Sequence, residues 1–246
     1  MKDIMLLWTI VVISACSQDN QQLPETMNQS NPGVLDQEIG YDRNELNSNL
    51  PTIGILIFDS FLTSEVIAPL DVFAKPTAQG KDLFNVILIG KENKIYRSEE
   101  GLNVLPDITT DQAPNLDVLV VPSSYDPIKQ QEDQELIKFI QKQHKNTQYT
   151  ASHCAGAFLL AEAGIVNNKK VVTYVTGGEA LQEQYPALRV MDDGEVSVMV
   201  DGKIISSNGA LVSYIASLDL LEKLTDSDHR KYVEDQLYLD RLKDDR

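Results

Sequence analysis

The stretch that decides the fold is Gln148-Tyr-Thr-Ala-Ser-His-Cys-Ala-Gly-Ala-Phe-Leu-Leu-Ala-Glu-Ala163. Its beginning, residues 148–152, is typical of a short strand, and a largely apolar helix begins abruptly at Cys154. The small residues 155–157 let the backbone crowd against the cysteine. This layout predicts a nucleophile elbow, a tight strand-to-helix turn that holds the Cys154 side chain above a sheet. A buried structural cysteine at a helix start is the alternative that the pattern leaves open.

Strands and helices alternate from Thr52 onward, which predicts the α/β class. The apolar runs 53–58 and 118–121 are typical of strands buried on both faces of a parallel sheet. We therefore expect a three-layer, flavodoxin-like sandwich with a mostly parallel central sheet, whose site lies at the carboxyl ends of the strands. The other expected strands are 84–89, 95–98, 102–108, 148–152, 171–174, 188–191, 196–200 and 203–206. The expected helices are 64–74 (with Ser64 as N-cap), 133–144, 154–163, 178–184, 211–224 and 227–243.

The N-terminus reads as an export signal. Residues 4–13 are mostly apolar but too few to span a bilayer as a helix. They end in Ile13-Ser-Ala-Cys16, which resembles the bacterial lipobox. This resemblance implies a lipoprotein signal peptide over 1–15, a lipid on Cys16, and an exported protein anchored in a membrane of the bacterial envelope, on the periplasmic side or the cell surface. A cleaved secretory signal with an incidental cysteine is the alternative.

Residues 16–50 are expected to be a disordered tether behind the lipidated cysteine. They are rich in Asn, Gln, Ser and Pro and have few bulky apolar side chains, so they cannot bury enough surface to order themselves. The remaining residues, 51–246, are long enough for one globular domain with a sizeable core.

Net charge and the spacing of cysteines and histidines limit the kinds of partner that we expect. The formal net charge is −16, with 37 acidic and 21 basic residues, which argues against nucleic acid because phosphate binding needs a basic face. No CxxC or HxxxH spacing is present, so no metal and no cofactor is expected. The expected partners are a small-molecule substrate or ligand and, through Cys16, the membrane, and a homodimer is left open.

Four segments resemble the ThiJ/PfpI superfamily, whose fold is similar to that of the class I glutamine amidotransferases. They are residues 54–61, 64–73, 117–124 and 153–164. Within the superfamily, the chain is most similar to the isonitrile hydratases and to the N-terminal domains of AraC-type regulators, a likeness carried by 158–166 and 206–210.

The resemblance implies the roles of four groups. Cys154 stands at the position of the nucleophile, and Glu65 at that of its acidic partner. The backbone N–H groups of Ala155 and Ser124 would form the oxyanion hole. A protonated Glu65 would donate a hydrogen bond to the thiolate and share one proton with it. We therefore expect a Cys154 thiol with a pKa below the free value of about 8.5.

The chain departs from the superfamily at several site positions. Tyr174 stands where many members have a histidine, so it is expected to orient a substrate or a water. Ser123 and Ser124 replace a usual pair of glycines, Ala155 replaces the threonine usual in the hydratases, and Ile215 an aspartate frequent in that branch.

The chain has three histidines, and only His153 lies next to Cys154. His153 adjoins Cys154 and either substitutes as a base or is a packed or surface histidine, whereas His144 and His229 are expected to be exposed on helices.

Two functions of different classes follow. The first is a cysteine-dependent hydratase or hydrolase that acts on a small electrophile such as an isonitrile, carbonyl or amide. The second is a non-catalytic binding or redox-sensing domain that keeps the fold and Cys154 but lacks the catalytic histidine.

Overall fold

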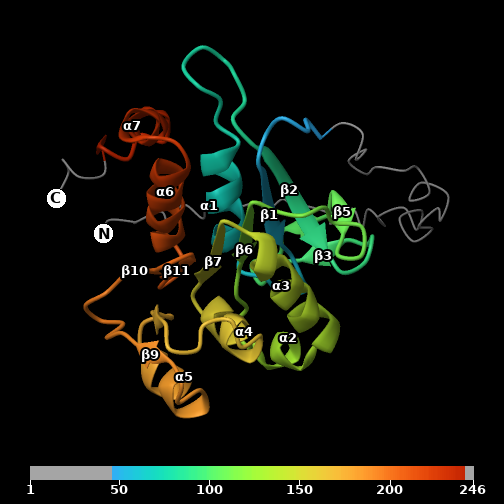
Figure 1. Ribbon diagram of the computed structural model, residues 1–246, viewed down its shortest axis with the longest axis vertical. Helices are drawn as coiled ribbons and strands as arrows, with labels where there is room; N and C mark the ends of the chain where they lie inside the picture. The colour runs from blue at the N-terminus through green and yellow to red at the C-terminus, as the bar shows by residue number, and fades with distance from the viewer. Residues whose placement is uncertain (1–45, 242–246) are drawn as a thin grey trace, which may run out of the picture. The chain divides into compact units, whose positions relative to one another are not determined.

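The structure, a computed structural model, describes residues 46–241, and a seven-stranded sheet forms their centre (Figure 1). Its strands are β1 Thr52–Leu56, β2 Asn85–Gly90, β5 Ile108–Thr109, β6 Val118–Val121, β7 Tyr149–His153, β10 Val198–Asp201 and β11 Ile204–Ser207. Their order is β10-β11-β7-β6-β1-β2-β5. Neighbouring strands pair in parallel except β10 and β11, which form an antiparallel hairpin.

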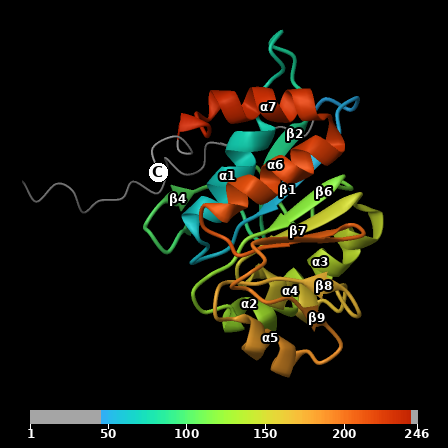
Figure 2. The ribbon, with the colours of Figure 1, turned by 90° about the vertical axis from the view of Figure 1, so that its left-hand side faces the viewer.

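Helices cover both faces of this sheet (Figure 2). One layer holds α1 Thr63–Phe73, α6 Val212–Leu224 and α7 Ser227–Gln236. The other holds α2 Ile128–Glu132, α3 Gln134–Asn146, α4 Gly156–Glu162 and α5 Gly178–Gln184. In the first layer α1 packs on α6, and in the second α3 packs on α4. The predicted three-layer α/β sandwich with a mostly parallel sheet is thereby confirmed.

The sheet centre explains the apolar runs of the sequence. Every residue of β1 and β6 is buried, as expected for parallel strands covered by helices on both faces. Strands, helices and loops share one apolar core that extends from Ile53 to Val233.

Several predicted elements need correction. Residues 102–108 were expected to be one strand, but β3 Tyr96–Arg97 pairs only with β4 Asn103–Val104, and β5 joins the edge of the main sheet. The expected strands 171–174 and 188–191 shrink to β8 Lys170–Val171 and β9 Arg189–Val190, which pair in parallel with each other. The short helix α2 was missed because five residues are too few to show a helical period.

The ends of two helices also differ from expectation. Helix α1 begins at Thr63 after Leu62 and has no side-chain cap, so the capping role predicted for Ser64 is wrong. Helix α7 ends at Gln236, earlier than the predicted 243.

The predicted signal peptide, Cys16 and most of the predicted tether lie outside the described residues, which begin at 46. No helix within 46–241 is both long and apolar enough to cross a membrane.

Candidate functional site

Cys154 lies in the turn between β7 and α4, at the carboxyl end of its strand. Its φ is +50°, in the left-handed region that costs a non-glycine residue about 1–3 kcal/mol. Two hydrogen bonds hold this turn: the Cys154 N–H donates to the Ser207 carbonyl at 2.8 Å, and the Thr173 hydroxyl donates to the Cys154 carbonyl at 2.9 Å. Neighbouring segments thus fix the backbone of Cys154 on both sides.

Glu65 reaches the same place from the first turn of α1 and is fully buried. Its Oε2 accepts a hydrogen bond of 2.7 Å from the Ser123 N–H, while Oε1 makes no hydrogen bond of normal geometry with the described residues. Gly209 shows how close the carboxyl and the cysteine are. A Cβ added to Gly209 would collide with both Glu65 Oε1 and Cys154 Cβ. The structure therefore brings together the predicted nucleophile and its acidic partner.

Burial moves the pKa of both groups towards the neutral form. It raises the pKa of Glu65 to about 7, although donors on Ser123 lower it in part. It also raises the pKa of the Cys154 thiol to about 11, and the charge of Glu65 adds to this increase, while the Ser123 hydroxyl and the Ala155 N–H lower it. The groups that act most strongly on the two pKa values include no cation. The prediction of a lowered thiol pKa is therefore wrong in direction, because desolvation outweighs the backbone donors.

The two expected oxyanion donors come from the ends of β6 and β7. Neither the Ser124 N–H nor the Ala155 N–H donates to an oxygen within residues 46–241. Ser123 and Ser124 have no positive φ, so serines take the place of the usual glycines without left-handed strain. The Ser124 hydroxyl lies 3.0 Å from Oε1 of Gln130 and is engaged on the side of α2. Their role in an oxyanion hole stays a prediction.

Tyr174 is held by packing. Its ring stacks on Phe158 of α4, with centroids 6.3 Å apart, and a Cβ on Gly177 would meet the ring at 2.5 Å. No hydrogen bond joins its hydroxyl to Cys154 in the described structure. The orienting role of Tyr174 stays a prediction.

His153 is a packed histidine. It is 1% exposed, its Nδ1 lies 2.8 Å from the Ser207 hydroxyl, and burial lowers its pKa to about 3. The other two histidines are half-buried, which corrects the expectation that they are exposed: His144 Nδ1 lies 2.9 Å from the Thr150 hydroxyl, and His229 stacks on Tyr232.

Residues 207–209 at the end of β11 carry part of the family resemblance, but the sequence reasoning did not predict that they close around Cys154. Ser207 accepts from the Cys154 N–H, and Asn208 donates to the Thr173 carbonyl at 2.7 Å. Gly209 follows with a φ of +86°, and its backbone lies directly against Cys154 and Glu65. An Asn-Gly pair directly after a strand was the available signal, because such a pair favours a left-handed turn.

No group of three or more His, Cys, Asp or Glu side chains within 46–241 is arranged to hold a metal ion.

Comparison with known proteins gives a consistent result. A sequence model of the DJ-1/PfpI family matches residues 51–223. The isonitrile hydratase of Pseudomonas putida is 28% identical over 186 residues, which cover 75% of this chain and 77% of the hydratase. The HTH-type transcriptional regulator GbdR of Pseudomonas aeruginosa is 23% identical over 184 residues, which are 74% of this chain but only 48% of the regulator. Both relatives match the branch inferred from the sequence.

Solved structures show the same fold. A ThiJ/PfpI family protein from Pseudomonas syringae superposes with a TM-score of 0.69 at 19% identity, over 87% of this chain and 82% of that one.

Proposed function

The chain belongs to the DJ-1/PfpI family, and on that premise we propose that it is a cysteine-dependent enzyme that adds water to a small electrophile, with an isonitrile as the first substrate to test. One observation carries the proposal: the buried Glu65 carboxyl, whose pKa is about 7, and the half-buried Cys154 meet at Gly209. A carboxyl that titrates near neutral pH is suited to take up and return a proton during turnover.

In the first step Glu65 acts as general base. The Cys154 sulfur attacks the terminal carbon of the isonitrile R–N≡C, while the ionised Glu65 carboxylate accepts the thiol proton. Glu65 returns this proton to the same carbon, which leaves the thioimidate R–N=CH–S–Cys154. Because the thiol pKa is about 11, the sulfur loses its proton only as it attacks.

Water completes the reaction. Its oxygen adds to the thioimidate carbon and loses both protons, one to Glu65 and the other to the imidate nitrogen. The Ala155 and Ser124 N–H groups stabilise the developing oxyanion. Collapse of the tetrahedral intermediate expels the Cys154 sulfur, which recovers its proton from Glu65, and releases the formamide R–NH–CHO.

Turnover of isonitriles, 2-oxoaldehydes and small amides tests this proposal. We expect Cys154→Ala to abolish turnover and Glu65→Gln to reduce it strongly, whereas Tyr174→Phe slows it modestly. In the wild type, kcat/KM should rise as the pH increases through about 7, because the base must be ionised. Absence of any Cys154-dependent turnover, or turnover that survives in Glu65→Gln with an unchanged pH profile, would contradict it.

A non-catalytic role as a ligand-binding domain is the second candidate. The raised thiol pKa favours it over redox sensing, because a thiol that stays neutral reacts slowly with peroxide even where it is only half-buried. A small molecule that binds equally well to the wild type and to Cys154→Ser, and that no form converts, would support this role.

We also propose that a lipid on Cys16 anchors the chain on the exported side of a bacterial membrane. Support comes from the order of an apolar run, small residues and a cysteine at 4–16. Expression with labelled fatty acid should label the wild type but not Cys16→Ala, and only the wild type should sediment with membranes. Equal labelling and solubility of the two forms would contradict the anchor.

A further inference from the structure

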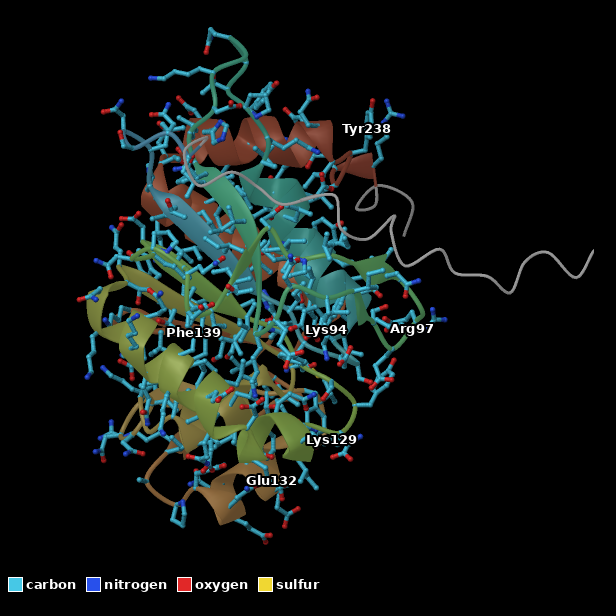
Figure 3. All side chains as sticks on the ribbon, turned by 90° about the vertical axis from the view of Figure 1, so that its right-hand side faces the viewer. Lys94, Arg97, Lys129, Glu132, Phe139 and Tyr238 are labelled. Carbon is cyan, nitrogen blue, oxygen red and sulfur yellow. The ribbon has the colours of Figure 1, made fainter. Side chains whose placement is uncertain are left out.

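A hollow lies at the carboxyl ends of the strands, and its lining residues do not include Cys154 or Glu65. Its volume is about 460 Å³, within the range of small-molecule sites. Figure 3 views the face that carries Lys94 and Lys129, which both line it.

The topology explains why a hollow forms here. From β1 the sheet continues to β2 on one side and to β6 on the other, so the strand order reverses at β1. Open α/β sheets bind ligands at such switch points, outside the carboxyl ends of the strands. The lining accordingly comes from the loops after three strands: Asp59 follows β1, Lys91 follows β2, and Asp126 follows β6.

The floor of this hollow is apolar and is formed by side chains that pack in the core. Ile57, Phe58, Tyr96 and Leu136 are buried members of the core that also line the hollow. Gln130 adds a buried polar group, whose Nε2 donates to the Asp59 carbonyl at 3.2 Å. An apolar floor with a few convergent polar groups is typical of ligand sites.

The charges around the rim are unequal. Five carboxylates and three lysines line the hollow, a formal charge of −2. Two of the lysines are neutralised locally, because Lys94 pairs with Asp59 and Lys91 with Asp133, each at 3.0 Å.

The remaining rim charges decide what the hollow attracts. Glu99 and Asp126 form no ion pair within residues 46–241, and Lys129 is the lining cation without one in that range. The charge left over after the internal pairs is therefore negative.

We propose that this hollow is a binding site for a small organic cation, a primary amine whose apolar body rests on Phe58 and Leu136 and whose ammonium group is attracted by Glu99 and Asp126. Binding at this site does not require Cys154, so the proposal does not depend on whether the domain is an enzyme.

Phenethylamine is the probe, titrated into the full chain and followed by calorimetry or by amide NMR shifts, with 3-phenylpropionate as an anion of similar size. The amine should bind more tightly than the acid. Asp126→Asn should weaken amine binding about two- to fivefold, and Lys129→Gln should strengthen it by a similar factor, because exposed charge pairs have effects of this size. Glu132→Gln is the matched control, since Glu132 is exposed on α2, the helix that carries Lys129, but does not line the hollow.

The site is established if Asp126→Asn lowers the affinity for phenethylamine, Lys129→Gln raises it, and Glu132→Gln and Cys154→Ala leave it unchanged. Three results would overturn it: no saturable binding, acid that binds as tightly as amine, or equal weakening by Glu132→Gln and Asp126→Asn, which would mean general attraction to an acidic chain. Loss of amine binding in Cys154→Ala would place the amine at the cysteine instead and would also overturn it.

Discussion

Charged groups at the carboxyl ends of the strands lie in two opposite environments. At Cys154, Glu65 is fully buried and bonded to a backbone N–H, and burial raises its pKa to about 7. At the neighbouring hollow, the side chains of Lys94 and Asp59 are 45% and 60% exposed and pair at 3.0 Å, and the hydrogen bond to Asp59 raises the pKa of Lys94.

The difference separates two kinds of site. Burial without a counter-ion favours the neutral forms and brings a carboxyl to a pKa where it exchanges protons near pH 7. Exposure beside a counter-ion keeps both groups charged, which suits recognition of a charged ligand. The carboxyl ends of one mostly parallel sheet thus carry both a candidate reactive centre and a candidate binding hollow.

The largest expected effect concerns His153, the buried neighbour of Cys154. The unfolded chain protonates this histidine below a pKa of about 6.5, but the folded chain does so only near a pKa of about 3. Lowering the pH between these values therefore favours unfolding, and this group alone should cost about 4 kcal/mol by about pH 3.5. Urea denaturation at pH 7 and at about pH 3.5 should show a smaller acid loss in His153→Gln than in the wild type. An equal loss in both would show that the histidine is not buried in the neutral form.

A smaller effect is expected from Gly209→Ala, which tests whether Glu65 and Cys154 are in contact. The new methyl would collide with both groups at a φ of +86°, so we expect a loss of about 3 kcal/mol in the free energy of unfolding. Gly80→Ala is the control, because Gly80 has a φ of +77° with nothing within 4 Å, and it should lose only about 1 kcal/mol. Similar losses for the two variants would mean that the site is looser than described.

The smallest effect on the free energy of unfolding is expected from the exposed ion pair of Lys94 and Asp59. Lys94→Gln removes the ion pair with Asp59, and we expect the free energy of unfolding to change by about 0.5 kcal/mol at low salt and by less at about 0.5 M NaCl. Chemical denaturation at the two salt concentrations measures this change. If the free energy of unfolding fell by more than about 2 kcal/mol at both salt concentrations, the pair would not be exposed as described and the two environments would not differ.

The sequence predicted the parts of this account that rest on local patterns. The apolar run of β1 predicted a central strand, the small residues after Cys154 predicted a tight turn before a helix, and resemblance to a family pointed to Glu65. The pKa of the thiol depends on how deeply Cys154 is buried and on which charges lie near it, and no local pattern reports either. The contacts of Gly209 and Ser207 with Cys154 join residues more than fifty positions apart, so they too required the structure.

The central claim is that burial without a counter-ion brings Glu65 to a pKa near neutral pH. Carbon-13 NMR of the full chain, labelled at the glutamate side-chain carboxyl carbons, tests it directly, with Glu65→Gln used to assign the resonance. The account predicts that the Glu65 resonance titrates with a midpoint at about 7. A midpoint at the ordinary value of 4.5 would contradict it, because Glu65 would then be solvated and fully ionised at neutral pH.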